Sequence, residues 1–414
     1  MIIKGDFNEA EVFTENIDKE TISQVKVLLN QEFVKNSSVK IMPDCHKGAG
    51  CVIGTTMTIK DKIVPNLVGV DIGCGVLCVE LSDIKLDLEK IDDFIKNKIP
   101  HGFKINNKAV VDYLDEISKV RCIDKIPKKI EEFNRALGSL GGGNHFIEID
   151  KDENDNKYLV IHSGSRNLGL QVANYYQNVG ANYYQNVGYE SLNYISDEYE
   201  IKAKELIESY KSSGKKKKIE KDLKKLKESF RVKSKVPKDL CYVEGKDLED
   251  YLHDMDIVQK YATKNREIMA RRIVEFMGLD YDKLNKFESI HNYIEVEKGF
   301  LRKGAISAYE GEDLLIPINM RDGVIIGKGK GNPNWNFSAP HGAGRILSRA
   351  EAKNKIHMND YKETMKDIFT TCVNVKTLDE APQAYKPIEE IINNIYDTVE
   401  ITKIIKPIYN FKSN

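Results

Sequence analysis

Residues 1–90 carry short apolar runs separated by glycines, which is the pattern of strands joined by tight loops. Such runs occupy 39–43, 50–54, 64–70 and 75–79. We predict short strands and tight loops at these positions, with the glycines supplying the sharp turns between them.

The pattern changes after residue 86. From Asp87 to Leu137 apolar side chains recur at helical spacing, so this segment is predicted to be helical. A glycine-rich turn at 138–143 follows, and then two apolar runs at 145–150 and 158–162 are joined by a polar loop. These two runs predict a hairpin of buried strands. Strands and helices in this order predict an α/β fold of the mixed α+β kind.

A basic run and a tandem duplication lie in the middle of the chain. Residues 173–180 are repeated at once as 181–188, which we interpret as a lengthened helix or loop rather than a stacking surface. Residues 211–235 contain twelve Lys or Arg and three acidic residues, including Lys215 to Lys218 and Arg231. They predict a protruding helical arm at about 205–236, for which we weigh attraction of RNA phosphates equally with a solvated surface.

No low-complexity linker divides the chain, so we predict one domain over 1–414 from which the arm protrudes. A second amphipathic stretch follows the arm at 247–276 and predicts another helix.

Composition narrows the class of protein. Of 414 residues, 41% are hydrophobic and 31% charged, which is ordinary for a globular chain. The net charge of −1 excludes a uniformly basic protein that coats nucleic acid, but it allows a local basic patch. No apolar run approaches the ~20 residues that span a bilayer, and no secretory signal is visible. Seven cysteines without disulfide spacing predict reduced thiols in a cytoplasmic protein.

Histidines provide the first chemical signal. Five of the eight lie in loops rich in glycine and small residues beside predicted strands, namely His46, His145, His162, His291 and His341. Such loops carry function, and glycine lets a ligand approach the backbone. One such histidine is more often structural than a ligand, but five together favour a shared site.

Asp71 and Cys74 lie three residues apart between glycines. A tight turn there can direct a carboxylate and a thiolate at one point. With nearby imidazoles, these groups suit one or two transition metals, and a bridging thiolate can hold two cations close enough to grip a phosphoryl group. The donor types fit Zn²⁺ as well as Mn²⁺.

Several motifs together resemble the RtcB family of RNA-splicing and repair ligases, and they occur in the family's order from about residue 39 to 412. They are MPDCHKGAGCVIG, VGVDIGCGV, LGGGNHFIEI, IHSGSRNLG, EGKDLEDYLHDM, HNY, RKGAISA, APHGAGRILSR, EAPQAYKPIEEII and IIKPIYNFK. The resemblance implies central β-sheets around a cleft for metal and nucleotide.

The same resemblance implies an activity. It points to a GTP- and Mn²⁺-dependent ligase that joins RNA ending in a 2′,3′-cyclic phosphate or 3′-phosphate to RNA beginning with a 5′-hydroxyl, through a GMP–histidine intermediate. Its partners would be GTP, broken or spliced RNA such as tRNA or rRNA, and a helper protein for turnover.

Roles for particular residues also follow from the resemblance. One Mn²⁺ would be held by Asp71, Cys74 and His145, and a second by Cys74, His162 and His291. His341 would accept GMP, while Asp44 and Arg166 would handle the RNA phosphate. The nucleotide-contacting positions would be Asn144, His145, Phe146, Ile147, Glu148, His291, Asn292, Pro317, Ile318, Asn319, Met320, His341, Gly342, Ala343, Gly344, Tyr385 and Lys412.

The chemistry of His341 suits its implied role, because an imidazole is a good nucleophile for phosphorus. Gly342 and Gly344 permit close approach of the backbone. A helix predicted to begin near Arg345 would point its N-terminus at phosphate.

The loop before His341 departs from the family pattern. The sequence PINMRDG at 317–323 stands where most members have a GSMGT loop, so Asn319 replaces a serine and Ile318 a glycine. Asparagine still donates and accepts hydrogen bonds, so we expect nucleotide binding to survive with altered preference. DCHKGAGCVIG likewise replaces the more usual DVHQGYGFPIG. We hypothesise a divergent branch that repairs nuclease-cut RNA rather than splicing tRNA introns.

Two other functions stay open at this point. The chain could be a metal-dependent RNA-end phosphodiesterase or guanylyltransferase that does not ligate, which the altered loop keeps open. It could also be a non-catalytic RNA-end-binding protein that uses the basic arm. Retention of His341 and of every implied metal ligand counts against a pure binder.

Overall fold

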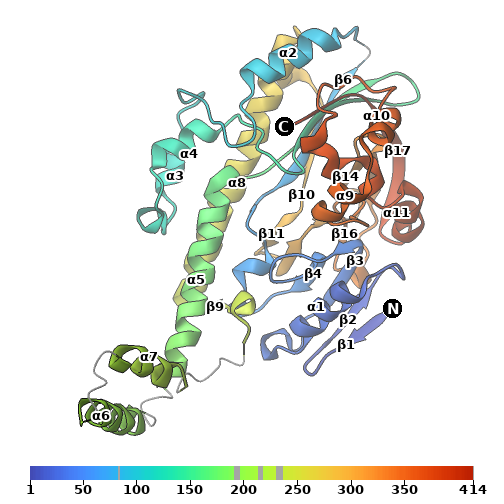
Figure 1. Ribbon diagram of the computed structural model, residues 1–414. Coiled ribbons are helices and arrows are strands. Elements are labelled where there is room, and N and C mark those ends of the chain that lie inside the picture. The colour runs from blue at the N-terminus through green and yellow to red at the C-terminus, as the bar shows by residue number, and fades with distance from the viewer. Residues whose placement is uncertain (83, 191–195, 213–217, 230–235, 414) are drawn as a thin grey trace.

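The computed structural model describes residues 1–82, 84–190, 196–212, 218–229 and 236–413. Two large β-sheets form the centre of the molecule, and two long helices run along one side (Figure 1). This arrangement confirms the mixed α/β fold with central sheets. Within the described ranges, none of the helices is long and apolar enough to cross a membrane.

Every neighbouring pair of strands in the seven-stranded sheet is antiparallel. In sheet order the strands are β10 (Lys286–Ile290), β6 (Gly75–Ser82), β8 (Lys157–Ser163), β7 (Phe146–Lys151), β17 (Val399–Lys412), β15 (Gly323–Gly329) and β14 (Asp313–Asn319). The pairing of β7 with β8 confirms the predicted hairpin.

Side chains of β7 alternate between two separate cores. Ile147 and Ile149 pack in one core with residues of a long helix, and Phe146 packs in the other with residues of β14 and β15. Both faces of the sheet are therefore covered at this point, which explains why β7 and β8 read as continuous apolar runs.

The six-stranded sheet has the order β1 (Ile2–Lys4), β2 (Glu9–Val12), β3 (Val39–His46), β4 (Ile53–Thr58), β12 (Phe300–Lys303) and β11 (Asn292–Glu295). Two small sheets pair β13 (Ala305–Ser307) with β16 (Ser338–Pro340), and β5 (Lys62–Ile63) with β9 (Val243–Glu244). Much of the predicted apolar run at 64–70 forms a 3-10 turn over Pro65–Leu67 instead of a strand, because proline favours the first position of a helical turn.

The long helices α5 (Arg166–Glu190) and α8 (Gly245–Phe276) pack against each other (Figure 1). The second of them confirms the helix predicted over 247–276, and its buried side chains include Tyr251, Ala262 and Ile268. Both copies of the duplicated octapeptide lie on α5, so the duplication lengthens a helix.

The remaining body helices are short. They are α1 (Lys19–Leu29), α2 (Leu88–Lys98), α3 (Leu114–Ser118), α4 (Ile130–Ala136), α9 (Arg349–Lys355), α10 (Met358–Thr364) and α11 (Ile388–Ile395). Further 3-10 turns cover Glu32–Val34, Ile123–Lys125, Lys238–Leu240, Tyr281–Lys283, Pro333–Trp335, Val375–Glu380 and Pro382–Ala384.

Two helix predictions were wrong in their extent. The segment from Asp87 to Leu137 is not continuously helical, because α2 ends before Pro100 and a non-helical stretch follows. The helix expected near Arg345 begins at Arg349, where Ser348 forms a capping box.

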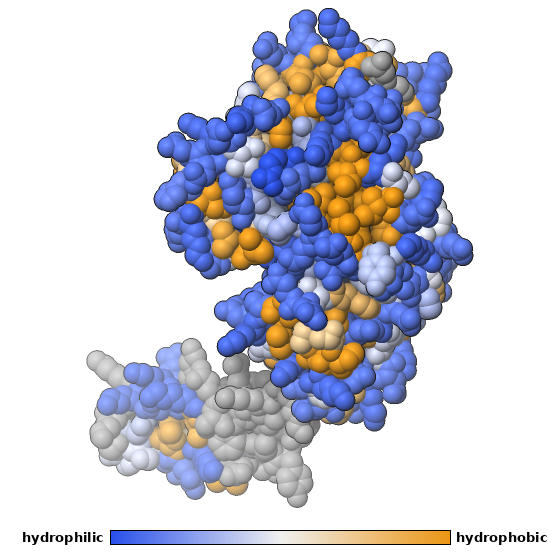
Figure 2. Space-filling view, turned by 90° about the vertical axis from the view of Figure 1, so that its right-hand side faces the viewer, coloured by the Kyte–Doolittle hydropathy of each residue, from blue (hydrophilic) through white to orange (hydrophobic). Residues whose placement is uncertain are grey.

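The predicted arm corresponds to α6 (Ser196–Ser212) and α7 (Ile219–Ser229), which project beyond the end of α5 (Figure 1). The Tyr210 hydroxyl donates a hydrogen bond to Asp222 at 2.9 Å and joins the two helices. Hydrophilic side chains cover much of the described arm (Figure 2). Of the basic run, Lys215 to Lys217 and Arg231 lie outside the described residues.

A buried asparagine on α8 fastens the glycine-rich turn to the sheet. The Asn265 side chain accepts the N–H groups of Gly138 and Ser139 at 2.8 and 3.1 Å. It donates to the Ser139 carbonyl, the Ser163 hydroxyl and the Gly164 carbonyl, each at 3.1 Å. Two segments that lead into the site described below therefore share one anchor.

We expect Asn265→Ala to lower the free energy of unfolding by about 3 kcal/mol, because several buried polar groups lose their partner at once. Urea denaturation measures this change. Lys260→Ala on the same helix is the control, since it removes only an exposed ion pair and should cost less than about 1 kcal/mol. Equal losses in the two variants would contradict the anchoring role.

Candidate metal and nucleotide site

The ends of four strands meet at one place in the seven-stranded sheet. The last residue of β10 pairs with the first of β6, and the end of β8 lies beside the starts of both β6 and β7. Cys74 directly precedes β6 and His145 directly precedes β7. His162 is the last residue but one of β8, and His291 directly follows β10. Strand register therefore brings together four residues that are far apart in the sequence.

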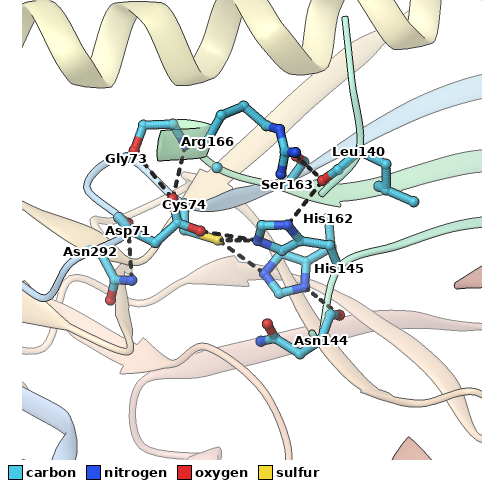
Figure 3. A network of polar contacts seen from close by, with 12 residues as sticks. Asp71, Gly73, Cys74, Leu140, Asn144, His145, His162, Ser163, Arg166 and Asn292 are labelled. Carbon is cyan, nitrogen blue, oxygen red and sulfur yellow. Dashed lines mark hydrogen bonds and ion pairs between the residues drawn. The ribbon is translucent and has the colours of Figure 1, made fainter. Parts of the chain in front are cut away.

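The Cys74 sulfur faces the rings of His145 and His162 (Figure 3). Its Sγ is 3.5 Å from Nε2 of His145 and 3.3 Å from Nε2 of His162. The Nε2 atoms of His162 and His291 are 3.4 Å apart. One sulfur and two imidazole nitrogens thus converge, and a third imidazole adjoins them through His162.

Asp71 adds a carboxylate from the turn before Cys74. Its Oδ2 is 3.1 Å from Nε2 of His145, and its Oδ1 accepts the Ser165 N–H at 2.9 Å. The turn requires glycine at 73, where φ is +72° and a Cβ would lie 2.8 Å from the Cα of Gln259. The Asp71 carboxylate and the Cys74 sulfur both lie within 3.5 Å of His145 Nε2, so the two groups point at one place as predicted.

Backbone carbonyls orient two of the rings. His145 Nδ1 lies 3.0 Å from the carbonyl oxygen of Leu140, and His162 Nδ1 lies 3.2 Å from that of Asn144. A carbonyl can only accept, so each Nδ1 carries a proton and each Nε2 is the ring nitrogen that faces the centre. This is how metal-binding histidines are held.

Burial controls the charge of the group. It raises the pKa of the Cys74 thiol well above its usual value, and it lowers the pKa of His162 and His291 well below theirs. Burial opposes ionisation of Asp71 as well, but hydrogen bonds from His145 and Ser165 outweigh it and lower the pKa of that carboxyl.

These donors fit a divalent transition metal. His291 Nδ1 is buried and has no hydrogen-bond partner in the described part of the chain, so it is a polar atom that a bound ligand could satisfy. A cation would let the buried sulfur ionise, and sulfur, imidazole and carboxylate together suit first-row ions. Cys74, His145 and His162 alone already place three donor atoms within 4.8 Å of one another.

His341 extends this row of imidazoles. It follows β16, and its ring centroid lies 4.8 Å from that of His291. Its Nδ1 is 2.6 Å from Oδ2 of Asp44, a fully buried residue on β3, and its backbone N–H donates to the same oxygen at 3.2 Å. The carboxylate holds the Nδ1 side of the ring, so Nε2 is the nitrogen turned away from it.

A cavity of about 810 Å³ opens beside His341, which is within the size range of small-molecule sites. Most predicted nucleotide positions line it, namely Asn144, Phe146, Glu148, Pro317, Ile318, Asn319, Met320, His341, Gly342, Ala343, Gly344, Tyr385 and Lys412. Gly344 is needed there because φ is +73° and a Cβ would lie 2.2 Å from the Asp44 carbonyl oxygen.

Four predicted nucleotide positions lie elsewhere. His145 and His291 belong to the cluster around Cys74. Asn292 donates to the Asp71 carbonyl at 3.2 Å and supports the turn. Ile147 is fully buried in the core that contacts α8, on the opposite face of β7 from the cavity.

An ion-pair network in the cavity wall was not predicted. Lys412 Nζ is 3.0 Å from Oε2 of Glu380, whose other oxygen lies 3.3 Å from Arg345 and 2.6 Å from Arg349. Burial would raise the pKa of Glu380, but Lys412 and the two arginines lower it to about 2. All four residues lie in or beside the motifs quoted above, but the sequence does not tell which of them pair.

His46 and Glu148 are two further ionisable residues in the cavity wall. His46 lines the cavity, and its Nδ1 is 3.1 Å from the Asp44 carbonyl oxygen. Its only signal was its place in a glycine-rich motif. Glu148 also faces the cavity, and burial raises its pKa to about 7 in spite of Lys412 and Asn410.

Asn319 uses its side chain within its own loop. Its Oδ1 accepts the N–H groups of Arg321 and Asp322, and its Nδ2 donates to the Asp322 carboxylate at 2.8 Å. The asparagine that replaces the expected serine therefore stabilises a turn between β14 and β15. Met320 is fixed by a hydrogen bond from the Tyr361 hydroxyl at 3.2 Å.

Arg166 lies at the other end of the site, beside the loop that carries His145. It begins α5 with φ +55°, an uncommon conformation for arginine. Its guanidinium donates to the Gly102 carbonyl at 2.8 Å and to the Ser139 hydroxyl at 3.0 Å. These contacts fix a cationic group near the metal cluster.

We expect Cys74→Ala to abolish metal binding, because the variant loses the donor that touches two of the imidazoles. Protein loaded with Mn²⁺ and desalted is measured by inductively coupled plasma mass spectrometry. Cys78→Ala is the matched control, since Cys78 is a buried thiol on β6 that packs in a separate core. Retention of the wild-type metal content by Cys74→Ala would contradict the assignment.

Comparisons with known proteins agree with this geometry. The family model described as tRNA-splicing ligase RtcB matches residues 24–413. An RNA-splicing ligase RtcB from Escherichia coli K12 is 28% identical, and the match covers 89% of this chain and 88% of that protein. A tRNA-splicing ligase RtcB from Nanoarchaeum equitans is 26% identical, and the match covers 94% of this chain and 90% of that protein. The chain belongs to the RtcB family.

Proposed function

We propose that this chain is a GTP- and Mn²⁺-dependent RNA ligase that joins 2′,3′-cyclic phosphate or 3′-phosphate ends to 5′-hydroxyl ends. The observation that carries the proposal is the place of His341. It lies between a buried set of metal ligands and a cavity of nucleotide size, with a carboxylate on one ring nitrogen.

His341 acts as the nucleophile in this proposal. The Asp44 carboxylate lies 2.6 Å from Nδ1 and would stabilise a proton there, which leaves the Nε2 lone pair for the α-phosphorus of GTP. The new N–P bond forms as pyrophosphate leaves, which gives a GMP–histidine intermediate. Such a phosphoramidate keeps the phosphoryl group reactive toward a weak nucleophile.

Two Mn²⁺ ions would be held on either side of Cys74. Asp71, Cys74 and His145 would bind one ion, and Cys74, His162 and His291 the other. When bound, the ions supply positive charge against the phosphates, which is a large part of phosphoryl-transfer catalysis.

The cavity wall would hold the guanylate. Lys412 is kept in place by Glu380 and lies 5.5 Å from the Phe146 ring centre, so one side offers a cation and an aromatic face together. Glu148 and Tyr385 provide further polar groups on the same wall. Gly342 and Gly344 let the backbone approach the phosphate.

RNA joining then needs two exchanges. A 3′-phosphate oxygen attacks the guanylate phosphorus and releases His341, and the 5′-hydroxyl next attacks the activated 3′-phosphate and releases GMP. A cyclic phosphate is first hydrolysed to the 3′-phosphate. Arg166, fixed beside the cluster, would contact the RNA phosphate.

The loop at 317–323 favours one second candidate, an RNA-end phosphodiesterase or guanylyltransferase that does not ligate. The Asn319 side chain is engaged by Arg321 and Asp322, which leaves one amide N–H for a nucleotide. Altered nucleotide binding is therefore a specific consequence of this sequence.

The first test is labelling with α-³²P GTP and Mn²⁺, followed by a denaturing gel. We expect an acid-labile label on the wild type and none on His341→Ala. Asp44→Asn should slow labelling by about 10²- to 10⁴-fold, because the ring loses its proton acceptor. His357→Ala, an exposed histidine at the start of α10, should label normally.

The second part of the test adds a 3′-phosphate RNA and a 5′-hydroxyl RNA and follows the joined product on a gel. Joining that requires GTP and His341 supports the ligase. A labelled protein that never joins these ends would favour the second candidate. A folded, metal-loaded protein that takes no label would overturn the guanylylation step.

A further inference from the structure

Phe103 is a fully exposed aromatic side chain in the loop that contacts Arg166. Its relative exposure is 107%, the highest of the large apolar residues in the described part of the chain. Single exposed apolar residues are common, so exposure alone has no meaning. The place is what matters, because the preceding residue, Gly102, accepts the hydrogen bond from Arg166.

The loop that presents Phe103 is tied down on both sides. Gly102 donates its N–H to the Gly141 carbonyl at 2.8 Å, and the Pro100 carbonyl accepts the Leu140 N–H at 2.8 Å. On the far side, the Asn106 side chain donates to the carbonyl oxygens of Arg135 and Leu137 at 3.1 and 2.8 Å. The ring is therefore held out from a fixed backbone.

The chain segment that carries Phe103 is basic. Residues 94–111 contain four lysines and no acidic residue, and Asp93 and Asp112 flank them. Lys104 and Lys108, which both follow Phe103 in this segment, are exposed. A positive segment with one protruding aromatic ring is complementary to single-stranded nucleic acid, in which phosphates alternate with stackable bases.

Bare backbone connects this loop to the nucleotide cavity. Asn144 lines the cavity, and Gly143 and Gly142 lead from it toward Gly102. A Cβ built on Gly142 would meet only the Gly102 Cα at 3.7 Å and the Ser413 hydroxyl at 4.0 Å. A Cβ on Gly143 would meet only the Arg349 guanidinium at 3.8 Å, so an extended strand can approach the backbone of these two glycines closely.

In-line geometry indicates which strand uses the path. The ring contacts run from His145 through His162 and His291 to His341, so Arg166 and Phe103 lie at the end of the row away from His341. Attack on the activated phosphate comes from the side opposite the leaving GMP. The strand that carries the 5′-hydroxyl therefore enters from this end.

We propose that Phe103 is a stacking platform for a base near the 5′-hydroxyl end of the RNA, with Lys104 and Lys108 contacting the phosphates of that strand. The inference rests on the proposed ligase function and assigns one of its two substrates to a surface. A protein partner is a poorer match, because one ring and two lysines fall far short of a stable protein interface.

Fluorescence anisotropy with a short RNA that has a 5′-hydroxyl and a 3′-fluorescein label tests the proposal. Phe103→Ala is expected to weaken binding about 5- to 100-fold without changing its salt dependence. Phe103→Tyr keeps a stackable ring and should bind as the wild type does. Lys104→Gln and Lys108→Gln should each reduce the slope of log affinity against log salt by about 0.7.

Tyr396→Ala is the matched control, because Tyr396 is an exposed aromatic at the end of α11 on another flank of the molecule (Figure 1). It should leave RNA affinity unchanged. Phe103 lies outside the nucleotide cavity, so GTP labelling of Phe103→Ala should equal that of the wild type.

Wild-type affinity in Phe103→Ala would overturn the platform. Loss of affinity only for an RNA with a blocked 5′ end and a 3′-phosphate would overturn the strand assignment. Loss of GTP labelling in Phe103→Ala would show damage to the residues around Cys74 and would also overturn the stacking platform. A wild type that binds the RNA but takes no label leaves the platform standing and removes the ligase proposal instead.

Discussion

The crowding of donor atoms around the Cys74 sulfur is the constraint on which the site depends. Two imidazole nitrogens lie within 3.5 Å of that sulfur, and a third imidazole follows at 3.4 Å from one of them. Burial raises the pKa of the Cys74 thiol and lowers the pKa of His162 and His291, so the uncharged forms are favoured where these donor atoms meet. A divalent cation would let the thiol ionise and would take up imidazole lone pairs, which gives the site a physical reason to bind metal.

The two sheets contribute different parts of the candidate site. Asp44 comes from β3 of the six-stranded sheet, while the candidate metal ligands adjoin strands of the seven-stranded sheet. His341 lies on the segment after β16 and contacts both sets, through Asp44 on one side and His291 on the other. Relative movement of the sheets would therefore separate His341 from the residues around Cys74.

Much of this site could be predicted from the sequence, for identifiable reasons. The hairpin of β7 and β8 could be predicted because both faces of these strands are buried, and the roles of Cys74 and Asp71 were suggested by the glycines on either side of them. Pairings between distant residues, such as Glu380 with Lys412, could not be predicted, because spacing along the chain does not tell which residues meet in the fold. The same limit hid the inward face of Ile147 and the local hydrogen bonds of Asn319. The predicted helix boundaries were wrong where Pro100 ends α2 and where Ser348 caps α9.

Anomalous diffraction tests most directly whether Cys74 bridges two metal ions. Crystals grown with Mn²⁺ would be measured on both sides of the manganese absorption edge. We predict two anomalous peaks, one between Asp71, Cys74 and His145 and the other between Cys74, His162 and His291. Peaks that lie away from the Cys74 sulfur, or none in a metal-saturated crystal, would contradict it.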